Sequence, residues 1–130
     1  MGKVSLPVVD VNRKIDAAAD VVWDLITDTR RWPQWGPSVR AVRCAECYIH
    51  EGLRGQVQTI AGLWLPFTVT DFEHNSYWAW RVAGILATGH RVEPLSTEQC
   101  QLSFTVPLLA APYAVVCRLA AVRIEQICAQ

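Results

Sequence analysis

At 130 residues, the chain is long enough for one domain and too short for a second hydrophobic core. Hydrophobic residues make up 52% of the sequence and charged residues 18%, which excludes an intrinsically disordered chain. Twelve basic and twelve acidic residues cancel, so the net charge favours neither nucleic acid nor an anionic membrane as a partner.

Two further features concern membranes and secretion. Residues 1–7 lack the apolar run of a signal peptide. The most apolar stretch, residues 106–122, is interrupted by two prolines and by Arg118, so we do not expect it to span a membrane. We therefore expect a cytoplasmic protein without stable membrane insertion.

The cysteines give no framework for a disulfide-rich or metal-binding domain. Five is an odd number, whereas a disulfide framework in a short secreted chain uses an even one. Cys44 and Cys47 form a lone CxxC, without the second ligand pair that completes a zinc site. Cys100 and Cys117 occupy apolar positions typical of a core. We expect no metal and no cofactor.

The first third of the chain predicts one strand and two helices. Residues 4–15 alternate at period two, as a strand does. Asp16 is a suitable N-cap for a helix over residues 17–26, where apolar residues recur at helical spacing. Residues 29–35 predict a second short helix or turn, broken by Pro33 and closed by a Gly-Pro pair.

The middle of the chain predicts a sheet, and its end a helix. Short, turn-like connections separate the strands, which favours an antiparallel meander. The six expected strands cover residues 39–47, 53–61, 64–74, 77–84, 86–93 and 98–106. After Pro107, apolar residues at three- and four-residue spacing as far as Ile127 predict one long helix, with Pro112 in its first turn.

This order, β-α-α-β×6-α, resembles the START-like or helix-grip superfamily, also called SRPBCC. Residues 22–28 (VWDLITD) followed by residues 32–35 (WPQW) resemble its opening helix pair, and residues 52–55 (GLRG) resemble the start of its third strand. Residues 77–82 (YWAWRV) and 89–94 (GHRVEP) resemble the paired middle strands of its bacterial polyketide cyclase/dehydrase branch.

The resemblance implies a single α+β domain over residues 1–130. In this helix-grip fold, a curved antiparallel sheet of about seven strands wraps around the long C-terminal helix, with two short helices after the first strand. The family's motifs specify a fold better than a reaction, because its members include lipid carriers, hormone receptors and cyclases.

Three hypotheses about function follow. In the first, the protein is a cofactor-independent cyclase or dehydratase, of lyase or isomerase type, acting on a polyketide-like or other hydrophobic carbonyl compound. In the second, it is a non-catalytic carrier or sensor for a lipid or an aromatic metabolite. In the third, it is an interaction domain with a filled core. A small hydrophobic ligand is the expected partner in the first two, and the protein could be a monomer or a homodimer.

Strand alternation predicts which side chains face the interior. If Arg81 faces water, Trp78 and Trp80 on the same strand face inward, and the same reasoning applies to each strand in turn. Trp32 and Trp35 either plug one end of the core or form a lid over the ligand. We expect the ligand to contact Trp78, Trp80, Phe67, Val69, Thr59, Thr88, Phe104, Tyr113, Cys117 and Trp35.

Two polar residues, His90 and Asp71, stand out in this apolar set. We expect Asp71 opposite Trp80 and Trp80 opposite His90, which separates the Asp71 and His90 backbones by about 9–10 Å in one row. In the catalytic reading, His90 is a general acid/base and Asp71 is its partner or a second proton-transfer group. In the alternative reading, His90 hydrogen-bonds within the sheet, and a bulge or the end of the strand turns Asp71 outward.

Overall fold

The computed structural model describes residues 8–130, apart from the side chains of Leu108, Leu109 and Ala111. Strand β1 runs from Val8 to Ile15, and residues 4–7 of the predicted strand lie outside the described residues. Helix α1 covers Ala19–Thr27. The predicted N-cap is wrong, because Ala18 occupies that position and the Asp16 carboxylate instead accepts a hydrogen bond from Gln99 Nε2, 2.8 Å away.

The WPQW segment completes the C-terminal end of α1. It follows the short 3₁₀ helix η1 (Thr29–Arg31) and forms the one-turn helix α2 (Trp32–Trp35). Trp32 Nε1 donates to the Ile26 carbonyl oxygen at 2.9 Å, and Trp35 Nε1 donates to that of Leu25 at 3.2 Å. Since the last carbonyl groups of a helix have no partner within the helix, the two indole N–H groups satisfy them and thereby fix both rings.

The described residues form one seven-stranded antiparallel sheet in the order β1-β7-β6-β5-β4-β3-β2. After β1, the strands are β2 (Val39–Arg43), β3 (Arg54–Thr59), β4 (Trp64–Glu73), β5 (Tyr77–Val82), β6 (Ile85–Ser96) and β7 (Gln99–Pro107). The predicted meander is therefore confirmed, and β1 joins it beside β7. Strand β2 is shorter than predicted, since the CxxC segment lies in the loop after Arg43.

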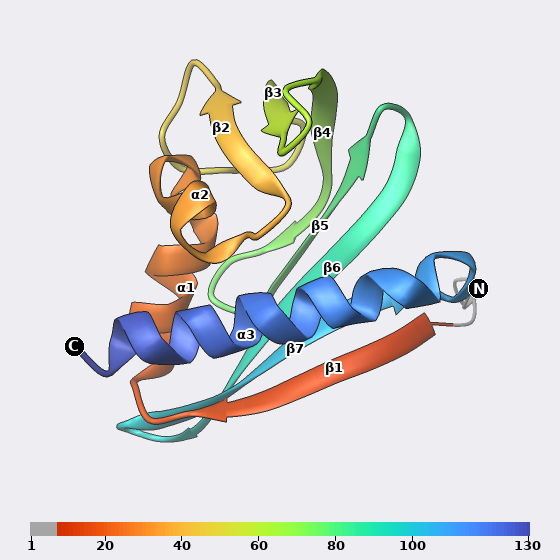
Figure 1. The fold of residues 1–130 in the computed structure, drawn as a ribbon. Coiled ribbons are helices and arrows are strands. Elements are labelled where there is room, and N and C mark those ends of the chain that lie inside the picture. The colour runs from red at the N-terminus through yellow and green to blue at the C-terminus, as the bar shows by residue number, and fades with distance from the viewer. Residues whose placement is uncertain (1–7) are drawn as a thin grey trace, which may run out of the picture.

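The C-terminal helix is interrupted near its start. A 3₁₀ helix, η2 (Leu108–Tyr113), contains Pro112 and a non-helical residue, Ala110, and α3 proper covers Ala114–Cys128. A proline inside a helix removes a hydrogen bond and clashes with the preceding turn, which explains the interruption. Helix α3 crosses the concave face of the curved sheet (Figure 1).

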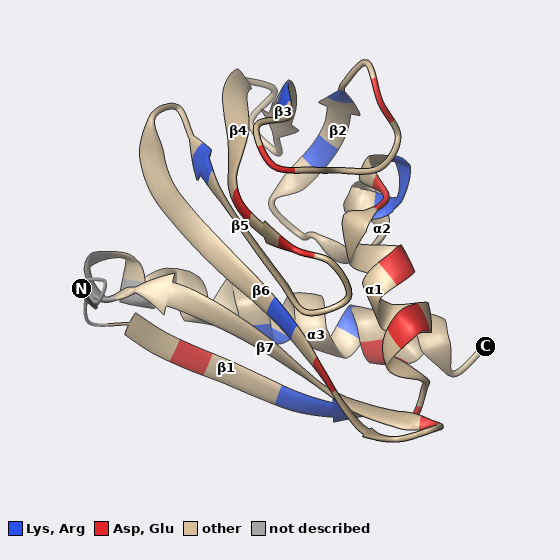
Figure 2. Cartoon of the chain, turned by 180° about the vertical axis from the view of Figure 1, so that it is seen from behind, with Lys and Arg blue, Asp and Glu red and all other residues tan. Residues whose placement is uncertain are grey.

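Small residues bring α3 close to the sheet. Its buried side includes Ala114, Cys117, Ala120 and Ala121, and short side chains permit close approach. An ion pair between Arg13 of β1 and Glu125 of α3, with an N–O distance of 2.7 Å, joins the helix to the sheet edge. Figure 2 shows charges of both signs distributed over several strands and helices. The interior between α3, α2 and the sheet contains a group of aromatic rings among its aliphatic side chains, including Trp32, Trp35, Trp78 and Phe104.

Candidate ligand-binding site

Around Asp71, the pairing of β4 with β5 differs from the predicted one, and a β-bulge follows in β4. Strand β4 shifts between Val69 and Asp71, so Val69 pairs with Trp80 and Asp71 pairs with Ala79. The expected pairing of Asp71 with Trp80 is therefore wrong. The extra residue in β4 moves Asp71 to the outer face of the sheet, where its carboxylate accepts a hydrogen bond from its neighbour Thr70 at 3.1 Å.

A second bulge, with its extra residue in β6 between Leu86 and Gly89, changes the partner of His90. His90 pairs with Trp78, and the expected pairing with Trp80 is wrong. On the next strand His90 pairs with Phe104. The inward row is thus Phe72, Trp78, His90 and Phe104, while the Asp71 row continues through Ala79 and Gly89. The structure does not bring Asp71 and His90 together.

His90 is enclosed by aromatic rings and only 2% exposed. Its imidazole stacks on the Trp78 ring, with centroids 3.7 Å apart and planes 11° from parallel. The Phe104 ring meets it edge-on at 5.3 Å. These contacts fix the orientation of the imidazole.

Hydrogen bonds within the sheet use both ring nitrogens of His90. Nδ1 lies 3.2 Å from the Trp78 carbonyl oxygen, and Nε2 lies 3.2 Å from Thr88 Oγ1. Since a carbonyl oxygen only accepts, Nδ1 carries the proton and Nε2 accepts from the Thr88 hydroxyl. Trp80 Nε1 in turn donates to Thr88 Oγ1 at 3.0 Å. The series of hydrogen bonds from Trp80 through Thr88 to His90 therefore uses these polar groups without any ligand or water.

Burial lowers the pKa of His90 to about 3, despite the opposing effect of its hydrogen bond to the Trp78 carbonyl. Desolvation disfavours the charged imidazolium, which explains the direction. His90 is consequently neutral at physiological pH. The neutral ring carries one N–H, at Nδ1, and this group already donates a hydrogen bond to the Trp78 carbonyl oxygen.

A small inner cavity of about 40 Å³ lies beside His90. Its wall comes from α2, the loop after it, β5, β6, β7 and α3, and includes Trp35, Trp78, Phe104 and Cys117. This space has room for a few water molecules or one small group such as a carbonyl, and is too small for an aromatic ring.

A larger outer pocket of about 370 Å³ adjoins the inner cavity. The two share Ser38, Val39, Trp80, Thr88 and Tyr113. The rest of the outer pocket is mainly apolar and includes Val57, Leu65, Val82 and Ala87. Its size falls within the range of about 300–1,000 Å³ found for ligand pockets.

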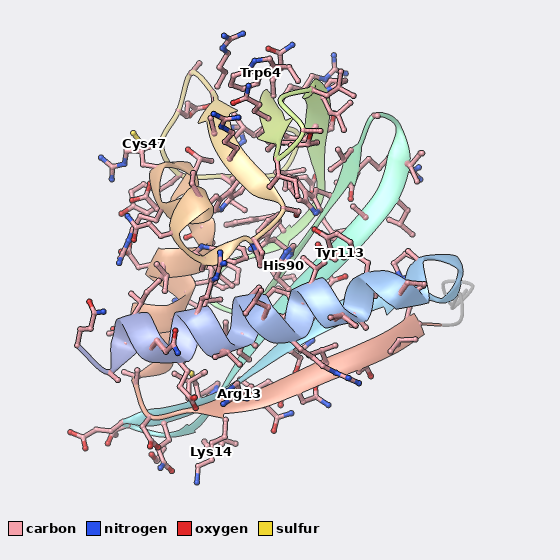
Figure 3. The ribbon with its side chains drawn as sticks, viewed as in Figure 1. Arg13, Lys14, Cys47, Trp64, His90 and Tyr113 are labelled. Carbon is pink, nitrogen blue, oxygen red and sulfur yellow. The ribbon has the colours of Figure 1, made fainter. Side chains whose placement is uncertain are left out.

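The pocket has an exposed aliphatic rim and a polar contact at the shared wall. Ile60 and Ile85, at the ends of two hairpins, are 72% and 71% exposed. The hydroxyl groups of Ser38 and Tyr113 hydrogen-bond to each other where the outer pocket meets the inner cavity. Figure 3 shows Tyr113 and His90 in the region between α3 and the sheet.

The predicted contact residues divide into four groups. Trp35, Trp78, Phe104 and Cys117 line the inner cavity with His90, and Thr59 lines the outer pocket. Trp80, Thr88 and Tyr113 line both. Phe67 and Val69 line neither, because the interior beside them is filled; the Trp32 ring centroid lies 5.4 Å from that of Phe67.

Sequence reasoning missed Ser38 as part of the site. It follows the Gly-Pro turn, and no motif distinguishes it from an ordinary loop serine. The Ser38–Tyr113 contact joins residues 75 positions apart, so only the folded chain reveals it.

The structure also bears on the cysteines and on membranes. All five cysteines are free thiols. Among the described residues, no three His, Cys, Asp or Glu side chains gather as a metal site requires. Within residues 8–130, no helix is long and apolar enough to cross a membrane.

A sheet that curves around a C-terminal helix, with an apolar pocket between them, defines a helix-grip protein. Solved structures share this fold. A START superfamily protein from Mycobacterium smegmatis has a TM-score of 0.75 and 13% identity, covering 95% of this chain and 97% of that one. The ZhuI aromatase/cyclase from Streptomyces sp. R1128 has a TM-score of 0.71 and 16% identity, covering 95% and 94%.

The sequence itself assigns the family. The family described as polyketide cyclase/dehydrase and lipid transport matches residues 7–125, and the chain belongs to it. The expected START-like, polyketide cyclase-like relationship is thereby confirmed. A search of curated proteins finds no significant match.

Proposed function

We propose that this protein binds a small hydrophobic molecule in the outer pocket and acts as a non-catalytic carrier or sensor of it. The observation that carries the proposal is the pocket of about 370 Å³, with its mainly apolar wall between the sheet and η2. The family description, which includes lipid transport, supports the same conclusion.

The wall of the pocket favours apolar ligands, and the area that such a ligand can bury predicts weak binding. Burial of apolar surface contributes about 25 cal/mol per Å², so a ligand that buries roughly 200 Å² gains about 5 kcal/mol before the entropic costs of association. This predicts dissociation constants closer to millimolar than to nanomolar. Such weak binding suits a carrier that must also release its ligand.

The state of His90 argues against catalysis as the first choice. A general base needs a free lone pair within reach of the substrate. The His90 Nε2 lone pair already accepts from Thr88, and the low pKa makes the imidazole a weak base. Asp71, which faces the opposite side of the sheet, has no part in either reading.

A cyclase or dehydratase is the second candidate, favoured by the family match and by His90 and Thr88 on the wall of the inner cavity. In this reading the Thr88 hydroxyl turns away and His90 Nε2 takes a proton from the carbon next to a substrate carbonyl. Replacement His90→Asn then abolishes turnover of such a substrate. In the carrier reading the same variant still binds hydrophobic ligands.

Titration with the neutral dye N-phenyl-1-naphthylamine tests the proposal, because its fluorescence rises in apolar surroundings. We expect saturable binding to the parent protein. Ala87→Phe fills the outer pocket and should weaken binding at least tenfold. The matched control, Ala61→Phe, adds the same ring at an exposed turn and should leave binding unchanged. Equal affinity of the parent and Ala87→Phe would contradict this location of the site.

A further inference from the structure

One buried donor at the inner cavity has no partner. Trp78 is 1% exposed and lines the cavity, and its indole Nε1–H has no hydrogen-bond partner among the described residues. A buried polar group normally has one, because an unpaired N–H loses its bond to water and gains nothing in return. An unpaired donor on a residue of the cavity wall indicates that an acceptor, from a water molecule or a ligand, belongs in the adjacent space.

The other buried donors around the cavity are already used. Trp32 and Trp35 donate to carbonyl groups of α1. Trp80, Thr88 and His90 form the internal chain that ends at the Trp78 carbonyl. The remaining polar contact, between Ser38 and Tyr113, is exposed, so water can satisfy it.

We infer that the ligand of this site is a hydrophobic molecule with one uncharged hydrogen-bond acceptor, such as a ketone or ester carbonyl, and that Trp78 Nε1–H receives this acceptor. The inference rests on the proposed function, because the apolar part of the ligand occupies the outer pocket. The carbonyl end enters the inner cavity past Ser38 and Tyr113, which line both spaces.

The chemistry of the walls excludes other polar ends. A carboxylate would lose its hydration for a single neutral donor, and a charged group is costly to bury without an opposite charge. A ligand end with only donors would face Trp78 Nε1–H, which is itself a donor. The inner cavity of about 40 Å³ admits a carbonyl and excludes a ring.

Calorimetric titration with a matched pair of probes, 1-indanone and indane, tests the inference. The two share a bicyclic skeleton and differ in the ketone. We expect 1-indanone to bind the parent protein about three- to tenfold more tightly, the difference that one neutral hydrogen bond makes. Replacement of Trp78 by 3-benzothienylalanine keeps the ring shape but puts sulfur in place of the N–H, and it should remove this preference while leaving indane binding unchanged.

The control Tyr113→Phe removes one of the hydroxyl groups that line both spaces, and it should retain the preference for the ketone. The indole N–H resonance of Trp78 gives a second readout that needs no variant. It should shift downfield on addition of 1-indanone and stay in place on addition of indane.

The outcomes separate the two proposals. Equal binding of both probes to the parent overturns the Trp78 inference and leaves the hydrophobic pocket standing. The inference is also overturned if the protein with 3-benzothienylalanine at position 78 still prefers the ketone. It is overturned as well if Tyr113→Phe abolishes the preference. If neither probe binds, the proposed function fails, and the inference that rests on it fails too.

Discussion

Acidification should destabilise this fold through His90. Burial lowers the pKa of the native imidazole to about 3, whereas the ordinary value is 6.5. Between these values the unfolded chain binds a proton that the native protein does not. The stabilisation is therefore complete above pH 6.5 and is lost as the pH falls towards 3.

The magnitude follows from the two pKa values. Each pH unit below 6.5 lowers the contribution of His90 to the free energy of unfolding by about 1.4 kcal/mol. This contribution is therefore about 2 kcal/mol smaller at pH 5 than at pH 8. The loss of stabilisation at pH 5 depends little on the native pKa of His90, provided that this pKa lies well below 5.

Urea unfolding at pH 8 and pH 5 measures this effect in the parent and in His90→Asn. The asparagine amide can still donate towards the Trp78 carbonyl, and it does not titrate. Between pH 8 and pH 5, we expect the free energy of unfolding to fall by about 2 kcal/mol more in the parent than in the variant. Nuclear magnetic resonance of the imidazole supplies a direct check, since His90 should show no titration down to the onset of acid unfolding.

Equal pH dependence of the two proteins would refute the reasoning. So would an imidazole that titrates near pH 6.5, because that result would mean that water reaches His90 in the native state. It would also restore His90 as a candidate general base at neutral pH.

Three further predictions concern packing and charge. Gly55→Ala should lower the unfolding free energy by about 1–3 kcal/mol, because its Cβ would lie 2.7 Å from a main-chain oxygen of β2, and urea unfolding measures the loss. Trp32→Phe leaves a cavity and an unpaired carbonyl in α1, and should lower the unfolding free energy by about 2–4 kcal/mol in the same assay, while Trp64→Phe at the start of β4, where the side chain is only half-buried, should cost less. The Glu46 carboxylate raises the pKa of His50, so this pair stabilises the fold below the ordinary value of 6.5 and loses its effect as the pH rises through the raised pKa. His50→Gln should therefore lower stability at pH 5.5 and leave it unchanged at pH 9, and an equal loss at both would contradict the assignment.

The fold could be predicted because its signals are local. Alternation at period two, turn residues between strands and the change to helical spacing after Pro107 are each present in short windows of sequence. The break before the last helix was not predicted, because Pro112 was expected in the first turn of that helix and instead lies in η2, before α3 begins. The exact ends of elements were less predictable, as the early end of β2 at Arg43 shows, because they depend on which strand lies alongside.

The site was predicted only in part, because it depends on register and on distant contacts. Alternation correctly selected Trp78, Trp80, Thr88 and His90 as inward residues. The register beside the β4–β5 turn, where Glu73 pairs with Tyr77, already places Asp71 opposite Ala79 and differs by one residue from the expected register. The two bulges farther along the strands leave no motif in the sequence. Whether inward rings line a pocket or fill a core depends on how closely α3 approaches, which composition alone does not fix.

The measurement that tests the central claim most directly is a methyl-resolved carbon–proton spectrum of the parent protein during titration with 1-indanone. The account predicts saturable shifts at methyl groups of the outer pocket, including those of Val57, Leu65, Val82 and Ala87. Absence of saturable shifts there, or shifts confined to Ile49 in the separate pocket beside α1, would contradict it.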